Sequence, residues 1–103
     1  MNKYGLHNKL TAKEGNAEQL AAILIQASEL VSKAPGCQLY SVATDPTLPN
    51  TVWVSEVWDT KEDHGNSLKM DGVMPLITQA MPLLSAMPEK GQELEVLGGH
   101  GVG

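Results

Sequence analysis

The sequence predicts an α+β domain in which a four-stranded antiparallel sheet carries helices on one face. Four short segments have the apolar patterns or composition typical of strands, and the segments between them include helical spacing, a helix-capping residue or turn residues. A length of 103 residues fits a single domain. The predicted order, β-α-β-β-α-α-β, is the split βαβ arrangement of ferredoxin-like domains.

The first strand is predicted over residues 3–11. The side chains that share one side of it are Tyr4, Leu6, Asn8 and Leu10, so Asn8 is the polar member of an apolar side. A helix follows, with Asn16 as the expected N-cap and Gln19 able to bond back to it. Its apolar stripe comprises Leu20, Ile23, Leu24, Ala27, Leu30 and Val31, and the Ala-Pro-Gly sequence at 34–36 ends it.

Two further strands, at residues 37–44 and 51–59, are joined by the turn-rich residues 45–50, which predicts antiparallel neighbours. The later strand is apolar on both sides, with Val52 and Val54 on one and Trp53 and Val57 on the other. Helices cover only one side of such a sheet. We therefore expect a homodimer in which the uncovered side is buried against a second copy.

The second half begins with a short helix that Thr60 caps, with Asp63 in its first turn. A third helix is expected from Met74, with Pro75 in its first turn. Its apolar stripe comprises Leu76, Ile77, Ala80, Met81, Leu84 and Met87. Pro82 predicts a kink or restart near Met81. A final strand at 92–97 completes a domain of residues 1–97, and the glycine-rich tail at 98–103 is expected to be mobile.

Composition and charge argue against several classes of function. The formal net charge is −5 and lysine and arginine do not cluster, which disfavours nucleic acid and anionic membrane surfaces as partners. No apolar segment approaches the length of a membrane span, and the first residues lack a secretory signal pattern, so we expect a cytoplasmic protein. Cys37 is the sole cysteine, which excludes an intramolecular disulfide.

A short series of motifs points to a family. The sequence Glu56-Val-Trp58, followed by Thr60-Lys-Glu-Asp-His64 and Ser67-Leu68, resembles the antibiotic biosynthesis monooxygenase domain, in particular its small quinol monooxygenase-like members. The resemblance extends from Tyr4 to Val96. It implies a dimeric α+β barrel, with a pocket between the sheet and the helices of each subunit. It also implies oxidation of a small aromatic phenol or quinol by O₂.

Oxygenation without a metal, haem or flavin requires an electron-rich substrate anion. The protein must remove a proton, stabilise the oxyanion and exclude water. His64 suits the first task, and the amide of Asn8 and the indole N–H of Trp58 suit the second. The expected substrate-binding residues are Leu6, Trp58, Ser67, Leu68, Met74, Ile77 and Met81. The alternative interpretations are a solvated or hydrogen-bonded His64, a core Trp58 and a buried Asn8 whose amide is satisfied within the fold.

Other chemistry is less well supported. Asn8-Lys9-Leu10-Thr11 resembles the opening strand of the haem-degrading branch, but Ser67 stands where that branch has tryptophan, and residues 75–78 contain no histidine to ligate haem. The three histidines lack metal-ligand spacing, and no Gly-x-Ser-x-Gly motif accompanies Ser67. An isomerase or detoxifying enzyme for a small oxygenated metabolite remains an alternative. So does a non-catalytic ligand-binding dimer.

Overall fold

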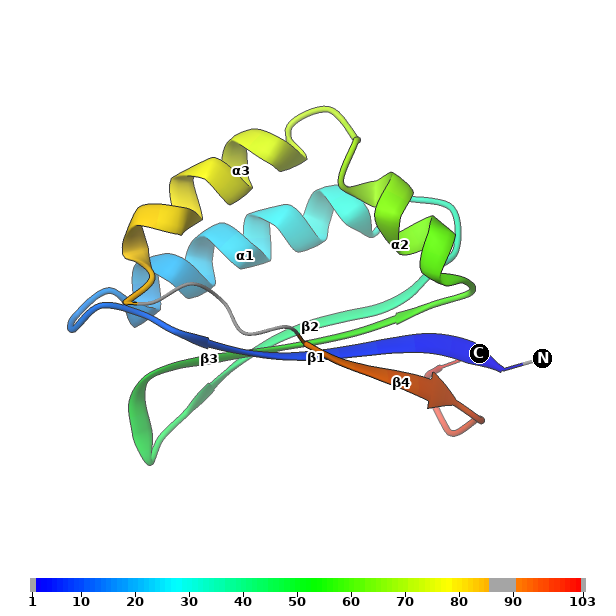
Figure 1. Cartoon of the computed structure of the whole chain (residues 1–103), viewed down its shortest axis with the longest axis horizontal. Helices are drawn as coiled ribbons and strands as arrows, with labels where there is room; N and C mark the ends of the chain where they lie inside the picture. Colours follow the sequence, from blue (N-terminus) through cyan, green and yellow to red (C-terminus); the bar gives the residue numbers. More distant parts are fainter. Residues whose placement is uncertain (1, 86–90, 103) are drawn as a thin grey trace.

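The computed structural model describes residues 2–85 and 91–102 and confirms the predicted ferredoxin-like α+β class. Figure 1 shows the helices together on one face of a single sheet. The elements are β1 (Lys3–Thr11), α1 (Ala17–Val31), β2 (Cys37–Asp45), β3 (Leu48–Trp58), α2 (Lys61–Ser67), α3 (Val73–Ala80), the 3₁₀ turn η1 (Met81–Leu83) and β4 (Gln92–Val96). The strand order is β2-β3-β1-β4, and every pairing is antiparallel.

The strand register determines which side chains face the helices. Leu6 lies opposite Glu56, and Asn8 lies opposite Val54. On the other side of β3, Tyr40 also lies opposite Glu56. Directly opposed residues of an antiparallel pair point to the same face of the sheet. The predicted side of β1 is therefore the helix-facing side, and Glu56 lies on it between two neighbouring strands.

The buried side chains fall into two clusters under the helices. One contains Leu20 and Val52 together with partly buried residues of η1, and the other contains Trp58, Val31 and Val73. These clusters hold α1 and α3 against the sheet at its two ends. Burial of each large apolar side chain contributes roughly 1.5 to 3 kcal/mol. In the described part of the chain, no helix is long and apolar enough to cross a bilayer.

The β2–β3 hairpin is tighter than the sequence pattern predicted. We expected the connection at residues 45–50, but β3 already begins at Leu48, which pairs with Asp45. The pairing shifts register between Thr44 and Asp45. Pro49 lacks an N–H for the ladder, and such an irregular end of a ribbon accommodates it. The last strand is close to the predicted range of 92–97, because β4 ends at Val96. The mobility of the tail at 98–103 stays a prediction.

Two side-chain N-caps were predicted from the sequence; the Thr60 capping hydrogen bond is confirmed, and the Asn16 one is wrong. Thr60 has extended backbone angles, and its hydroxyl accepts a hydrogen bond from the Asp63 N–H at 3.0 Å, as predicted. Asn16 occupies the N-cap of α1, but its side chain makes no capping bond. Its φ of −108° and ψ of 4° depart from the extended conformation that directs a capping side chain toward the first turn.

Proline ends the third helix where the sequence predicted a restart. α3 stops at Ala80, and the chain continues as the tighter turn η1, which contains Pro82. A proline at this position removes one helical hydrogen bond and collides with the preceding turn. The expected apolar role of Met87 lies outside the described residues.

Candidate active site

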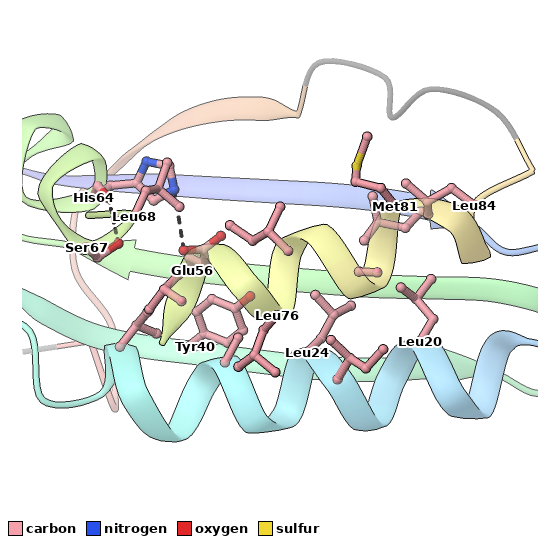
Figure 2. A pocket seen from close by; sticks show the side chains of 17 residues that line it. Leu20, Leu24, Tyr40, Glu56, His64, Ser67, Leu68, Leu76, Met81 and Leu84 are labelled. Atoms are coloured by element: carbon pink, nitrogen blue, oxygen red, sulfur yellow. Dashed lines mark hydrogen bonds and ion pairs between the residues drawn. The ribbon is translucent and has the colours of Figure 1, made fainter. Parts of the chain in front are cut away.

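A cavity of about 170 Å³ lies between the helix-facing side of the sheet and the helices. Figure 2 shows α1 and α3 flanking it, with side chains from both pointing inward. Its apolar lining comprises Leu10, Leu20, Ile23, Leu24, Ala27, Val31, Leu68, Val73, Leu76, Ile77, Ala80, Met81 and Leu84. The remaining lining residues are Tyr40, Glu56, His64 and Ser67. The cavity is thus an apolar space with a small set of polar groups, which is the usual composition of a small-molecule site.

Glu56 is the charged group at the centre of the polar set. Its side chain is 7% exposed. The Trp58 indole N–H donates to its Oε1 at 3.0 Å, and the Nε2 of His64 lies 3.6 Å from the same oxygen. Burial raises the pKa of Glu56, while the indole hydrogen bond and the nearby His64 act in the opposite direction. A carboxylate held in this way accepts a proton more readily than one in water.

His64 is placed by the α2 helix that Thr60 caps. Its ring lies 5.8 Å from the Trp58 ring in an edge-on arrangement and 5.9 Å from the Tyr4 ring. Its side chain is 20% exposed and approaches Glu56 with Nε2. The imidazole is therefore packed on aromatic rings and oriented by a carboxylate, as in acid–base pairs where one group positions the other. It is not turned out to bulk solvent.

Two hydroxyls complete the polar end. The Ser67 side chain is buried and donates to the backbone carbonyl of His64 at 2.6 Å, which ties the two residues within α2. Burial and the negative charge of Glu56 raise the pKa of Tyr40. Tyr40 is therefore a neutral phenol at physiological pH. Its hydroxyl remains a hydrogen-bond donor toward any oxyanion in the cavity.

The structure brings five of the predicted site residues to the cavity. His64, Ser67, Leu68, Ile77 and Met81 line it. They come from α2, the loop that follows it, α3 and η1. Helical spacing identified Ile77 and Met81 in the sequence, whereas His64, Ser67 and Leu68 were identified from the motif that resembles the family. Their roles in binding or catalysis stay predictions.

The other four predicted residues are not among the lining residues. Met74 lies in the first turn of α3 with 52% of its surface exposed, and Leu6 lies on β1 opposite Glu56 and Glu93. The Asn8 amide lies against Gly91, so close that a Cβ at Gly91 would overlap it. Trp58 is fully buried, and its indole N–H donates to Glu56 instead of pointing to a substrate. Its geometry is that of a core residue that also orients a carboxylate.

Glu56 and Tyr40 are cavity residues that were not predicted from the sequence. A signal was present for Glu56, because it shares the apolar side of β3 with Val52, Val54 and Trp58. Burying a carboxylate on such a side costs free energy unless it is hydrogen-bonded, so the position of Glu56 in the sequence indicates a partnered or functional carboxylate. Tyr40 gave no comparable signal. Only the register of β2 on β3 places it beside Glu56.

Glu56 and His64 are also the potential metal ligands of this cavity. Within residues 2–85 and 91–102, no group of three His, Cys, Asp or Glu side chains is arranged to hold a metal ion. Two ligands are fewer than the three or four that protein zinc sites use.

The fold and cavity define a ferredoxin-like domain with an apolar cavity between its sheet and its helices. More specifically, the chain belongs to the antibiotic biosynthesis monooxygenase family, whose model matches residues 3–73. A provisionally named antibiotic biosynthesis monooxygenase from Chloroflexus aurantiacus J-10-fl is 40% identical, with 98% of this chain and 99% of that chain covered and a TM-score of 0.88. A comparison with curated proteins gives no significant match.

More distant solved structures share the fold. A protein of Nitrosomonas europaea, given the same provisional family name, is 13% identical, covers 92% of this chain and 90% of its own, and has a TM-score of 0.86. A single-residue mutant of SnoaB, a cofactor-independent oxygenase from Streptomyces nogalater, is 14% identical, with 97% and 98% covered and a TM-score of 0.80. At these identities the likeness concerns the architecture.

Proposed function

We propose that the protein is a cofactor-independent monooxygenase that oxidises a small phenol or quinol with O₂ in this cavity. Membership of the antibiotic biosynthesis monooxygenase family supports it, as does the likeness in fold to a cofactor-independent oxygenase. The observation that carries the proposal is the Glu56–His64 pair at the polar end of an apolar cavity. Such a pair supplies the proton acceptor that the chemistry needs.

The proposed reaction starts with the substrate hydroxyl. Its proton passes to the Glu56–His64 pair, and the resulting phenolate is electron-rich enough to transfer an electron to O₂. Tyr40, as a neutral donor, stabilises the negative charge on the phenolate oxygen. We assign this role to Tyr40 because it lines the cavity, whereas Asn8 lies against Gly91.

The atoms of the reaction balance without a further reductant. Oxygen adds to a ring carbon that bears hydrogen, beside or opposite the hydroxyl, to form a hydroperoxide. Loss of water then gives the quinone, so one oxygen atom stays in the product and the other leaves as water. The substrate O–H and C–H bonds supply the two hydrogen atoms and the electrons. The apolar walls keep bulk water away from the intermediates.

Cavity size favours a single aromatic ring. An apolar cavity of about 150 Å³ is known to bind benzene. The space of about 170 Å³ therefore admits one ring and a few further atoms. This agrees with the small aromatic substrate expected from the sequence, and it disfavours fused polycyclic substrates.

Oxygen consumption tests the proposal. Phenols and quinols are presented to the purified protein in an oxygen electrode, and the products are identified by mass spectrometry. Replacing His64 by Gln or Glu56 by Gln is expected to lower kcat by roughly 10² to 10⁴. His100→Gln is the matched control, because His100 is exposed, follows β4 and is not among the cavity-lining residues. Full activity in His64→Gln and Glu56→Gln would contradict the proposal.

The same acid–base pair also suits an isomerase. Proton removal at one carbon and return at another needs the Glu56–His64 geometry but not O₂. The electrode separates the two functions directly. Conversion of a small oxygenated metabolite without oxygen uptake would favour the isomerase.

We also propose that the uncovered face of the sheet pairs with a second copy of the chain. Trp53 on β3 points to that face, and so does Leu94 on β4, which is 51% exposed. Mass measured by light scattering tests the pairing. The chain is expected to be a dimer that Leu94→Asp dissociates. Met74→Asp serves as the control, since Met74 is equally exposed but lies on α3; a monomeric native chain would refute the pairing.

A further inference from the structure

The polar groups of the cavity are confined to one end. Figure 2 shows His64, Glu56 and Tyr40 toward one side of the view, whereas Leu20, Met81 and Leu84 lie toward the other. These apolar side chains come from α1 and from the turn that follows α3. A ligand that fills the cavity therefore meets hydrogen-bonding groups with one end and hydrocarbon with the other.

The polar end also has a defined charge. Among the described lining residues, no lysine or arginine is present, and His64 is the one basic side chain. Its imidazole lies 3.6 Å from the Glu56 carboxylate, which offsets any positive charge it carries. An incoming carboxylate would meet a buried negative charge without a compensating cation. Like charges placed together in this way oppose binding strongly.

The apolar end has a second consequence. A hydroxyl placed opposite the first across the ring would lie against the apolar walls of the cavity near Leu24 and Leu76, which Figure 2 shows between the polar end and Leu20. A buried hydroxyl without a hydrogen-bond partner lowers affinity by roughly 10-fold to 100-fold. By contrast, a short alkyl group at the same position gains affinity from contact with those side chains.

We propose that the preferred ligand is an uncharged single-ring phenol whose polar substituents all lie on one side of the ring and whose opposite side carries a short alkyl group. Its hydroxyl faces Glu56, and its alkyl group faces Leu76. In this arrangement Glu56 is a specificity-determining residue that rejects acids. The inference rests on the proposed function only in using the same cavity, since it concerns the class of ligand and not its oxidation.

Anaerobic binding measures this preference without turnover. The probes are 4-ethylphenol, hydroquinone and 4-ethylbenzoate, followed by calorimetry. 4-Ethylphenol is expected to bind at least about 10-fold more tightly than hydroquinone and about 100-fold more tightly than 4-ethylbenzoate. Glu56→Gln should bring the benzoate to within about 10-fold of the phenol, because it removes the negative charge and keeps the shape. Hydroquinone or benzoate binding as tightly as 4-ethylphenol to the native chain would overturn the proposal.

The length of the alkyl substituent tests the orientation of the ligand in the cavity. Leu76→Ala should shift the preferred substituent from ethyl to propyl or butyl, because it removes carbon atoms from the apolar wall that the alkyl group faces. Leu83→Ala is the matched control, since Leu83 packs on the same core but is not among the cavity-lining residues. An unchanged preference in a folded Leu76→Ala protein would refute the orientation. If that variant does not fold, the three-probe comparison on the native chain decides.

The outcome is separable from that of the oxygen assay. The predicted order of affinities without oxygen uptake would leave the ligand class standing and remove the monooxygenase. Oxygen uptake with a reversed order of affinities would leave the monooxygenase standing and remove the proposed ligand class.

Discussion

The hydrogen bond from Trp58 to Glu56 gives a stability prediction whose size depends on pH. Trp58→Phe removes the indole N–H that donates at 3.0 Å and keeps an aromatic ring in a fully buried position. A hydrogen bond to a charged group contributes about 1.5 to 3 kcal/mol, whereas one between neutral groups contributes about 0.5 to 1.5 kcal/mol. The smaller ring adds a cavity cost on the order of 1 kcal/mol, which does not depend on pH.

The sign follows from the titration of Glu56. Burial raises its pKa, so the native fold of the wild-type chain loses stability as pH rises from the ordinary carboxyl range through the raised pKa. Without the indole N–H, the buried carboxylate is less well stabilised, and that loss becomes larger. The Trp58→Phe penalty should therefore be about 2.5 to 4 kcal/mol near pH 8 and smaller by about 1 kcal/mol or more near pH 4.

Urea unfolding at fixed protein concentration measures this penalty across the pH range. Val73→Ala is the packing control, because Val73 belongs to the same buried cluster and carries no hydrogen bond to Glu56. Its penalty is expected to be independent of pH. If the Trp58→Phe penalty were equally constant, the indole would be acting as packing alone, and the reasoning about Glu56 would be wrong.

Three further perturbations test the surroundings of the site. Gly36→Ala is expected to destabilise the fold by about 1 to 2 kcal/mol in urea unfolding, because Gly36 has φ of +85° and a Cβ there would overlap the Asp63 carboxylate; an unchanged midpoint would contradict this. Thr60→Ala should lower the free energy of unfolding by about 1 kcal/mol through loss of the α2 cap, whereas Thr60→Ser should keep the stability of the native chain. Equal thermal midpoints for all three proteins would argue against the cap. Glu56→Gln should abolish the decline in stability as pH rises through the raised pKa of Glu56; a decline that persists in that variant must come from another group.

The fold was predictable because local pattern and tertiary structure agree along most of the chain. An apolar alternation that Asn8 interrupts identified the helix-facing side of β1, and helical spacing identified the buried side of α1. Thr60 and Pro82 acted through local backbone chemistry, so their effects could be predicted from their own segments. The start of β3 could not be predicted from its own segment, because Leu48 becomes a strand residue only by pairing with Asp45 across an irregular turn.

The candidate site was predictable only in part, for a related reason. Residues that reach the cavity from one helical stripe, such as Ile77 and Met81, share a spacing that the sequence displays. Glu56 and Tyr40 meet only through the alignment of two strands, which depends on register and not on spacing. Asn8 was placed on the correct side of β1, but the residue against which its amide lies is Gly91, near the opposite end of the chain.

At Glu56, the residue that would stabilise the fold most differs from the residue that the proposed function needs. A purely structural β3 would continue the series of Val52 and Val54 with another apolar side chain, because burying a carboxylate costs free energy that a methyl-bearing side chain would not. The chain instead keeps a carboxylate there and supplies it with the Trp58 N–H and the His64 imidazole. Departures from local preference that neighbouring residues so specifically compensate tend to occur at functional sites. Glu56 also lines an apolar cavity instead of closing it, which supports the proposal that the reaction takes place at this end of the cavity.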